Sequence, residues 1–552
     1  MARPGLFAAL FSDAALTRNG VLWGSGGLTL ATVLAGLHTR QCLWGLVLLL
    51  PVLAVCLYDL TQREHALRRN FPGSARMRWF FEWLRPYLHA YIVEGELDGR
   101  PFNHDERALI YARAHGTVDA HPFGTDLDVY SGEYEWLAHS MQPNPDAPKD
   151  MRVKVGSDQC ARPYMASRLN ISAMSFGALG ANAIAALNLG AKTAGCYHDT
   201  GEGAMSPYHL AHGGDVVWQI ASGYFGCRDA QGRFDPAMFA DHAAADSVRM
   251  IEIKLSQGAK PGHGGMLPAA KITPEIAATR GIAMGQDCIS PPGHSAFRTP
   301  RELVEFAARL RELSGGKPVG LKLCVGLPHE LFAIAKAMVE TGITLDFIVI
   351  DGAEGGTGAA PKELSDRMGM PLREGLILAR NALVGAGLKG QVRLAASGKV
   401  TSGASIAINA ALGADWCNAA RAFMFSLGCI QSRQCHTGHC PTGIATQSPA
   451  RQRALVVEEK AERVARFHRA TVHALHEIVV AAGLDSPSDF RPSHLRQRIN
   501  VAEMRQMDEI YPFVQAGELL NGTGHEQLRR WWEAADPDSF RRRDGDRLAP
   551  VR

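Results

Sequence analysis

Between residues 169 and 427 the sequence repeats one rhythm: a short apolar run, a glycine-rich or polar loop, and an alanine-rich stretch with helical periodicity. Short apolar runs that alternate with helical stretches are typical of parallel strands joined by helices. The pattern therefore predicts an α/β fold, a closed TIM-type (β/α)8 barrel. The eight runs are "LNISAMSF", "AGCYHDTG", "IEIKLSQG", "QDCISPPG", "PVGLKLCVG", "FIVIDGAEGG", "VRLAASGKV" and "DWCNAARAF".

An open, doubly wound sheet is the alternative architecture for such a pattern. It usually has about six strands and one glycine-rich fingerprint after its first strand. No G-x-G-x-x-G segment follows the first run here, so the barrel is the better prediction. In a barrel, every segment that follows a strand lies at the carboxyl end, where catalytic residues gather.

The chain has 552 residues, too many for one ordinary domain. We predict an N-terminal membrane hairpin (1–60), a mixed region and linker (61–150), the barrel with a cysteine loop (151–450), and a C-terminal helical extension and tail (451–552). The net charge of +3 is too small to indicate nucleic acid. The odd count of 11 cysteines does not fit a secreted disulfide scaffold, so we expect a reducing compartment.

Two segments near the N-terminus, 20–37 and 41–58, contain no Asp, Glu, Lys or Arg. Their length is at the short end of what crosses a bilayer. Two apolar cores joined by a short turn differ from a signal peptide and predict a transmembrane helical hairpin. A buried helical pair or an in-plane anchor is the alternative, because glycines and Pro51 interrupt the segments.

Arginines are distributed unequally around this hairpin. Because positive residues favour the cytoplasmic side, the distribution predicts a cell-membrane protein with its catalytic body in the cytoplasm. The arginines outside the two segments are Arg3, Arg18, Arg63, Arg68 and Arg69, against Arg40 alone in the turn.

The segment "RRNFPGSARMRWFFEWLRPYL" (68–88) is basic and aromatic. Such a composition suits a membrane interface. A helix that packs Trp79, Phe80 and Trp83 onto the body explains the same composition. The sequence leaves both interpretations open.

Three cysteines, Cys429, Cys435 and Cys440, lie within "GCIQSRQCHTGHCPTGIATQ" (428–447) with the spacing C-x5-C-x4-C. Zinc usually takes four ligands in close pairs, so three thiolates followed by a proline fit an iron-sulfur cluster better. A three-iron cluster needs only three protein ligands. Zinc held with the help of His436 and His439, or inert buried thiols, are the alternatives.

The segment "IEIKLSQGAKPGHGG" (251–265) places two lysines after a strand. Lys254 at the strand end faces the barrel interior, where a buried ammonium needs an anionic partner. A flavin edge that becomes negative on reduction is one such partner; an internal ion pair with Asp351 or Glu202 is the other. Lys260, in a glycine-flanked loop, can reach a substrate carboxylate.

Glycine-rich loops follow the last strands of the predicted barrel. "DGAEGGTGAAP" (351–361) indicates that a flat or bulky group approaches the backbone. "SGKVTSG" (397–403) and "NAAR" (418–421) occupy the usual position of a phosphate site, with Lys399 and Arg421 as donors. One ligand, FMN, accounts for all three loops.

Five motifs together resemble the FMN-binding synthase domain of glutamate synthase, in its stand-alone form without the glutaminase domain. They are "SAMSFGALG", "TGEG", "IEIKLSQGAKPGHGG", "DGAEGGTGAAP" and the cysteine segment, in order over roughly 165–450. The resemblance implies a barrel with FMN and a 3Fe-4S cluster, in which reduced flavin delivers hydride to 2-iminoglutarate formed from 2-oxoglutarate and ammonia.

The resemblance also implies roles for individual residues. Cys429, Cys435 and Cys440 would ligate the cluster, and Glu202, Lys254 and Lys260 would be catalytic, with Glu202 near the incoming ammonia. Substrate contacts would come from Lys260, Arg280, Met266 and Ser222. The residues implied in FMN binding are Met174, Ser175, Lys254, Gln257, Asp351, Gly355, Gly356, Ser397, Gly398, Lys399, Ala420 and Arg421.

The chain departs from the family pattern at three places. Met266 replaces a substrate-binding glutamine in "GGMLPA", which removes a polar contact to the keto acid. Tyr224 replaces an arginine in "ASGYFG", and tyrosine does not supply the charge of that arginine. His198 and Asp199 precede "TGEG", where the family has serine and asparagine.

No amidotransferase segment and no fold for a nicotinamide nucleotide are evident in the sequence. We therefore expect ammonia or an amine as nitrogen source and an electron-donor protein such as ferredoxin or a reductase subunit. The sequence is compatible with a homo-oligomer and does not require one. Two other functions fit part of the pattern. One is an FMN-dependent 2-hydroxy or 2-amino acid oxidase using His263 and Arg280, and the other is a non-catalytic membrane redox subunit.

Overall fold

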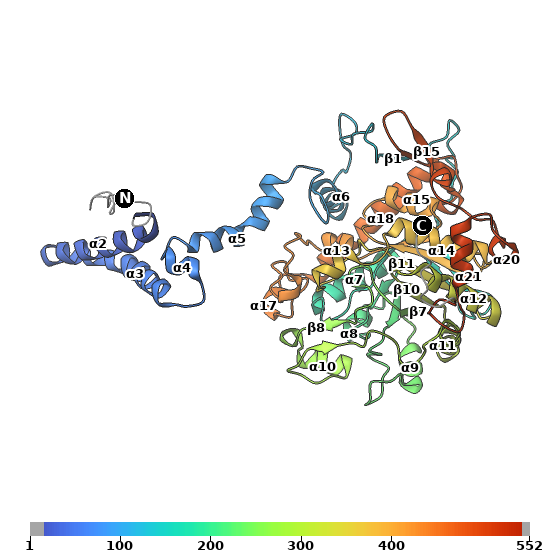
Figure 1. The fold of residues 1–552 in the computed structure, drawn as a ribbon, viewed down its shortest axis with the longest axis horizontal. Helices are drawn as coiled ribbons and strands as arrows, with labels where there is room; N and C mark the ends of the chain where they lie inside the picture. The colour runs from blue at the N-terminus through green and yellow to red at the C-terminus, as the bar shows by residue number, and fades with distance from the viewer. Residues whose placement is uncertain (1–15, 544–552) are drawn as a thin grey trace, which may run out of the picture. The chain divides into compact units, whose positions relative to one another are not determined.

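The computed structural model describes residues 16–543, with side chains from residue 19, and divides the chain into two compact units, Met1–His104 and Asp105–Arg552 (Figure 1). Arg3 and the side chain of Arg18, which entered the orientation argument, lie outside this description.

The second unit is built on a closed barrel of parallel strands, as the sequence rhythm predicts. Neighbouring strands pair in parallel all the way round, and β13 pairs with β4 to close the ring. An open doubly wound sheet is therefore excluded. The barrel strands are β4 (Leu169–Ile171), β5 (His198–Asp199), β6 (Val216–Ile220), β7 (Val248–Lys254), β10 (Val319–Leu323), β11 (Phe347–Asp351), β12 (Arg393–Ser397) and β13 (Trp416–Ala419).

One of the eight predicted strands is wrong. The run at 286–293 forms β9 (Cys288–Ile289), which pairs antiparallel with β8 (Met266–Leu267) outside the barrel. The missing barrel strand is β6, "VVWQI", which pairs with β5 and β7. An apolar run becomes a barrel strand only where the strands beside it in space pair with it. The run at 286–293 instead pairs with β8, which lies in the same long connection between β7 and β10.

Helices surround the barrel (Figure 1). The long C-terminal helix α18 (Val457–Ala481) packs along α7 and α15 on the outside of the barrel. This approach depends on glycine, because a Cβ on Gly190 of α7 would lie 2.5 Å from the Cγ1 atom of Val464. The helices between strands are α7 (Ala181–Ala194), α8 (Pro207–Leu210), α9 (Pro236–Ala243), α10 (Pro274–Arg280), α11 (Pro300–Leu313), α12 (Pro328–Thr341), α13 (Lys362–Arg367), α14 (Leu372–Gly385) and α15 (Gly403–Ala411).

Short elements complete this unit. The strand β1 (Glu135–Leu137) joins β14 (Leu495–Arg498) and β15 (Met504–Gln506) in a small antiparallel sheet. The remaining elements are α6 (His104–His115), β2 (Val153–Val155), β3 (Tyr164–Ala166), η3 (Ala269–Lys271), α16 (Arg421–Ser426), η4 (Cys435–Thr437), α17 (Pro449–Gln452), η5 (Pro487–Asp489), η6 (Pro492–His494), α19 (Met507–Ile510), α20 (Glu518–Asn521) and α21 (Glu526–Ala534).

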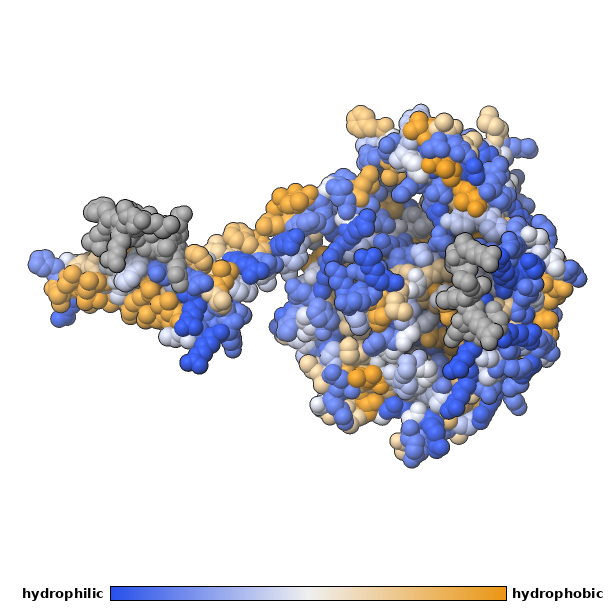
Figure 2. Space-filling model, in the orientation of Figure 1, coloured by the Kyte–Doolittle hydropathy of each residue, from blue (hydrophilic) through white to orange (hydrophobic). Residues whose placement is uncertain are grey.

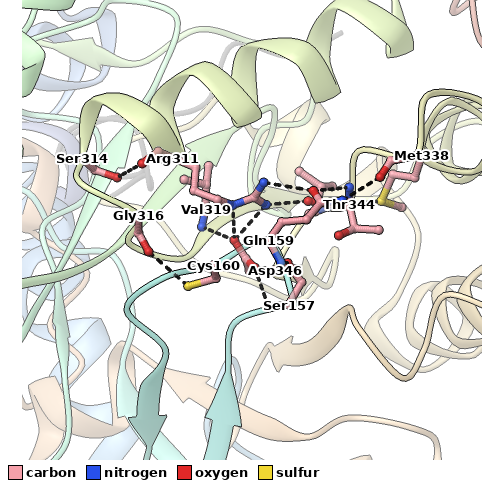
Figure 3. A network of polar contacts seen from close by, with 12 residues as sticks. Ser157, Gln159, Cys160, Arg311, Ser314, Gly316, Val319, Met338, Thr344 and Asp346 are labelled. Atoms are coloured by element: carbon pink, nitrogen blue, oxygen red, sulfur yellow. Dashed lines mark hydrogen bonds and ion pairs between the residues drawn. The ribbon is translucent and has the colours of Figure 1, made fainter.

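The amino-terminal end of the barrel is closed by the β2–β3 hairpin and one buried carboxylate (Figure 3). Asp346, which is fully buried, accepts hydrogen bonds from the Arg311 guanidinium at 3.0 Å and from the backbone N–H groups of Val319 at 2.8 Å and Ser157 at 2.6 Å. It thereby ties α11, the start of β10 and the segment after β2 together. A buried carboxylate with this many donors is fully satisfied.

The barrel interior changes character along its axis. Inward-facing residues near the closed end are apolar, including Val217, Met250 and Phe347. Two to four residues further along the same strands the inward-facing side chains are polar or ionisable, because alternate residues of a strand face the same side. The polar residues, all buried, are Asn170, Asp199, Gln219, Glu252, Lys254, Lys322, Asp351, Ser397 and Asn418.

The first unit contains two helices that are long and apolar enough to cross a membrane by length and composition, at Asn19–His38 and Arg40–Thr61. The second of these combines a 3-10 turn, η1 (Arg40–Gly45), with α3 (Leu46–Thr61), and the first lies within α2 (Leu16–His38). Most of their apolar side chains are exposed, as the hydrophobic surface in Figure 2 shows. The unit continues with α4 (Ala66–Asn70), α5 (Arg76–Leu88) and the π-helical turn η2 (His89–Val93).

Candidate active site

A lysine–glutamate ion pair lies at the carboxyl end of the barrel. Lys254 is the last residue of β7, and its Nζ atom lies 2.6 Å from the Oε2 atom of Glu202. The Gln257 side-chain oxygen also accepts a hydrogen bond from this ammonium. Both ion-pair side chains are shielded from solvent, with 9% of Lys254 and 20% of Glu202 exposed. The structure thus confirms Glu202 and not Asp351 as the direct partner of Lys254.

Lys260 and Arg280 are buried beside this pair. Burial by itself would raise the pKa of Glu202, but Lys254, Lys260 and Arg280 lower it to about 2. Burial lowers the pKa of Lys260, and the Glu202 charge only partly offsets that effect. Three cations therefore surround one carboxylate, and this cluster, Glu202, Lys254, Lys260 and Arg280, carries a net positive charge that suits an anionic ligand.

Arg280 is the last residue of α10, a different segment at the same end of the barrel. Its Nη2 group donates to the Phe176 carbonyl at 3.0 Å, and its guanidinium lies 5.4 Å from the ring centroid of Phe225. Its Nε atom is buried and has no hydrogen-bond partner among the described residues. Buried polar atoms are normally paired, so this donor is available to a ligand.

Two glycines allow the cluster to assemble. A Cβ on Gly265 would lie 2.6 Å from a Glu202 carboxylate oxygen, and a Cβ on Gly203 would lie 2.5 Å from Arg280 Nη2. Any larger residue at either position would displace a charged group. The glycines of "TGEG" and of the loop after Lys254 thus have a packing role at the site.

Beneath the cluster lies a second set of ionisable groups that the sequence analysis missed. Glu252 is hydrogen-bonded to Asp199 and accepts a further bond from the Gln219 amide at 2.6 Å. Burial and the neighbouring Asp199 raise the pKa of Glu252 well above its usual value. Burial lowers the pKa of Lys322, but Asp351, Glu252 and Asp199 more than compensate, and Lys322 stays charged.

Tyr224, at the position of the family arginine, does not point into the charged cluster as a ligand would. It is fully buried with a left-handed backbone (φ 46°), and its hydroxyl lies 3.0 Å from Nδ1 of His294 and accepts from the Ala296 N–H at 3.1 Å. The Nε2 atom of His294 lies 2.8 Å from the Lys254 carbonyl oxygen. Tyr224 and His294 therefore hold the end of β7, a support that the motif comparison did not predict.

The other predicted substrate residues lie on the segments around the mouth. Met266 is 37% exposed on β8, opposite Ile289 of β9, which is 65% exposed. The Ser222 hydroxyl donates to the Pro291 carbonyl at 2.5 Å. His263 is exposed, and its Nδ1 atom lies 2.8 Å from the Gly264 carbonyl oxygen, so it is not buried with the four charged residues.

Residues predicted for a phosphate and a flavin follow β11, β12 and β13. Asp351 accepts from the Gly258 N–H and from the Ser397 hydroxyl, both at 2.8 Å. Arg421 is bonded to the Glu354 carbonyl at 2.6 Å, and Lys399 is exposed with a left-handed backbone (φ 46°). Gly398 and Ala420 follow β12 and β13, while Met174 and Ser175 lie in the loop after β4.

The glycines of the loop after β11 mostly pack against the chain itself. A Cβ on Gly355 would lie 2.9 Å from the Gly352 carbonyl oxygen, and one on Gly356 would lie 2.8 Å from Arg421 Nε. A Cβ on Gly258 would lie only 1.6 Å from the Gly352 carbonyl oxygen. The loops after β7 and β11 therefore touch each other at glycine positions. Among Gly258, Gly355, Gly356 and Gly358, only Gly358 faces open space.

The three cysteines of the loop after α16 are neighbours. Burial raises the pKa of Cys429 to about 12, with a further contribution from the thiols of Cys435 and Cys440. Burial would also raise the pKa of Cys440, but the Thr442 hydroxyl and backbone N–H groups that bond its sulfur lower it below its usual value. Sulfur atoms that accept backbone N–H bonds are typical of iron-sulfur sites.

A buried lysine lies beside this loop. Lys271 donates to the Cys435 carbonyl at 2.9 Å and to the Ala178 carbonyl at 3.4 Å, and its described contacts include no carboxylate. Such an ammonium favours an anionic group nearby, which fits three thiolates. In residues 16–543, however, no three His, Cys, Asp or Glu side chains converge tightly enough to hold a metal ion. The donor set fits a cluster chemically, while its convergence is not seen.

Ionisable side chains at the carboxyl end of a closed parallel barrel define an enzyme of the (β/α)8 class. Residues 137–485 match the family model described as the conserved region in glutamate synthase. This chain therefore belongs to the glutamate synthase family and is a glutamate synthase-like oxidoreductase.

The relatives support this assignment over most of the chain. A glutamate synthase large subunit-like protein of Bacillus subtilis, YerD, is 34% identical over 514 residues, which cover 85% of this chain and 97% of the relative. The archaeal glutamate synthase (NADPH) of Methanocaldococcus jannaschii is 34% identical over 390 residues, 70% of this chain and 72% of the relative. A solved structure of a mandelate oxidase variant aligns with a TM-score of 0.39 and 16% identity over 78% of this chain and 99% of that one.

Replacing Glu202 by Gln is expected to destabilise the second unit. The substitution leaves the buried ammonium of Lys254 without its charged partner, next to two further cations. We expect a loss of about 3 kcal/mol in the free energy of unfolding, measured by denaturant titration. The exposed pair Arg530–Glu526 provides the control; Glu526→Gln should change stability by less than about 0.5 kcal/mol. Equal effects of the two substitutions would contradict the buried pair.

Stability is expected to fall as the pH falls from about 6.5 to about 4. Burial lowers the pKa of His294, His209 and His468 to about 4. In this interval the imidazoles of the unfolded chain bind protons that the buried imidazoles of the folded chain do not bind. Unfolding therefore becomes more favourable as the pH falls. His294→Asn should reduce the slope by up to about 1.4 kcal/mol per pH unit. The exposed His473 is the control; an unchanged slope in His294→Asn would disprove the assignment.

Proposed function

We propose that this protein is an FMN and iron-sulfur oxidoreductase that reductively aminates a 2-oxo acid, 2-oxoglutarate above all, with ammonia or an amine. The observation that carries the proposal is the cluster of Glu202, Lys254, Lys260 and Arg280 at the barrel mouth. Its net positive charge suits a dicarboxylate, and its position is where enzymes of this fold bind substrate. Of the relatives named above, one is a glutamate synthase large subunit-like protein and another is an archaeal glutamate synthase (NADPH).

The chain's own residues then have distinct tasks. Lys260 and the unpaired Nε–H of Arg280 bind substrate carboxylate. Glu202, whose pKa is about 2, is an ionised acceptor that orients ammonia and is too weak a base to store a proton at neutral pH. Lys254 supplies a fixed positive charge at the mouth, and Tyr224 and His294 hold its strand end in place.

FMN supplies the hydride chemistry when bound. Lys399 and Arg421, after β12 and β13, are the cations proposed for its phosphate, and Lys254 is the cation proposed for its ring edge. Asp351 and Ser397 hold each other at the strand ends below. These donors fit a dianionic phosphate and a ring that becomes negative on reduction.

The loop with Cys429, Cys435 and Cys440 is proposed to hold a 3Fe-4S cluster, supported by the N–H bonds to Cys440 and by the buried Lys271. Electrons would come from a separate donor protein. The apolar helices α2 and α3 are proposed to anchor the enzyme in the cell membrane with residues 105–552 in the cytoplasm. No observation in the structure favours the oxidase, because His263 is exposed.

The substrate is tested by anaerobic reduction of the purified protein, followed by addition of ammonium with individual 2-oxo acids. We expect 2-oxoglutarate to reoxidise the flavin, observed by absorbance, and to yield glutamate by mass spectrometry. Lys260→Met should raise the KM for 2-oxoglutarate at least about ten-fold, because a charged partner is lost. Turnover of an apolar keto acid without any dicarboxylate would reject the proposed substrate.

The cluster is tested by Cys435→Ser. We expect the variant to lose iron while it retains FMN, because none of the residues proposed to bind FMN lies in the cysteine loop. Cys160→Ser is the matched control, since the Cys160 thiol contacts the Gly316 carbonyl at the opposite end of the barrel. Zinc in place of iron in the wild-type protein would defeat the cluster assignment.

A further inference from the structure

Helix α5 (Arg76–Leu88) exposes a broad apolar face. Met77, Phe80, Phe81 and Trp83 are between 47% and 61% exposed. With the less exposed Leu84 and Leu88 they recur at intervals of three and four residues, which places them on one side of the helix. Figure 2 shows hydrophobic and hydrophilic atoms side by side on the surface of this unit.

The apolar surface continues beyond the helix. Tyr91, Ile92 and Val93 of η2 are 60%, 74% and 67% exposed. Arg78, Glu82 and Arg85 lie on the other side of α5. A helix that is apolar on one side and charged on the other, with aromatic residues at its edges, matches an interfacial amphipathic helix.

One buried ion pair fixes where this helix begins. Asp59, fully buried in the last turn of α3, accepts from Arg76 Nη2 at 2.7 Å and Nε at 3.0 Å, and from the Gly73 N–H at 3.1 Å. The first residue of α5 is thus bound to the end of the apolar hairpin. If the hairpin spans a bilayer, α5 starts at the headgroup level.

The charge of the segment selects the lipid. Residues 63–88 contain six arginines and two glutamates, and with Arg76 paired to Asp59 a net charge of +3 remains. Arg68 also stacks on Trp79, with its guanidinium carbon 4.3 Å from the ring centroid. Basic residues next to a membrane-spanning helix attract anionic lipid, while tryptophan and tyrosine prefer the headgroup region.

We propose that α5 and η2 form a second membrane contact, lying in the plane of an anionic lipid surface with Phe80, Phe81 and Trp83 inserted between headgroups and the arginines at the phosphates. This inference rests on the proposed membrane anchoring of α2 and α3. The contact holds residues 76–93 along the bilayer surface, which a hairpin alone does not do.

The test uses the full-length protein in vesicles of phosphatidylcholine with or without phosphatidylglycerol, each doped with a lipid that carries a photoactivatable group near its glycerol. After illumination, labelled peptides are identified by mass spectrometry. We expect labelling of both 20–58 and 76–93 in the anionic vesicles. The double substitution Phe80→Ser, Trp83→Ser should abolish labelling of 76–93 while 20–58 remains labelled.

Charge is tested separately with Arg78→Gln and Arg85→Gln, each of which should weaken labelling of 76–93 in anionic vesicles about five-fold. Tyr130→Ser, at a position 68% exposed in the second unit, is the matched control and should change nothing. All these positions are exposed or lie outside the core, so unchanged thermal unfolding of residues 105–552 is the folding check.

The outcomes separate this inference from the membrane proposal. Labelling of 20–58 without 76–93 overturns the inference and leaves the anchor intact. Absence of label in both segments overturns the anchor itself. Equal labelling of 76–93 in neutral and anionic vesicles overturns the role of the arginines.

Discussion

The buried ammonium of Lys254 determines how the mouth of the barrel is arranged. Because alternate residues of β7 face inward, the side chain of the lysine at its last position points into the barrel and is buried away from solvent. An unpaired ammonium there would cost several kcal/mol, so the loop after β5 brings Glu202 to 2.6 Å. Gly265 and Gly203 permit that approach, and Lys260 and Arg280 follow on the same side. The surplus of positive charge then makes the mouth a receptor for anions.

The fold was predictable from periodicity to the extent that pairing partners are local in sequence. Seven of the eight runs became barrel strands. Each of those before β13 is followed by a helix that brings the chain back to the amino-terminal end of the barrel, where the next strand begins. The strand β6 escaped prediction because only the four-residue α8 separates it from β5, which breaks the rhythm. The run at 286–293 satisfied the local pattern and failed, because pairing with β8 removed it from the barrel.

The site was predictable where unusual residues follow strands, and less so inside the barrel. Lys254, Lys260, Glu202 and Arg280 were recognised from motifs, and the structure brings them together. Asp199, Glu252 and Lys322 were missed as a group, since their contacts join three strands. A signal existed: Glu252 and Lys254 are two residues apart in a buried strand and must share a face. Glycine-rich loops, in contrast, did not distinguish room for a ligand from close loop packing.

Met266, a departure from the family pattern, and the charge of the cluster act in opposite directions on the choice of the proposed substrate. The sizes of the two free-energy terms decide between them. Met266 offers a partly exposed apolar contact, worth about 1–2 kcal/mol to an apolar side chain. With Lys254 paired to Glu202, Lys260 and Arg280 remain for the proposed substrate, so a monocarboxylate would leave one buried cation uncompensated, at a cost of about 3 kcal/mol or more. Tyr224 removes no charge from this balance, because its hydroxyl is committed to His294 and the Ala296 N–H. The electrostatic term is the larger, and it supports the dianionic substrate that we propose.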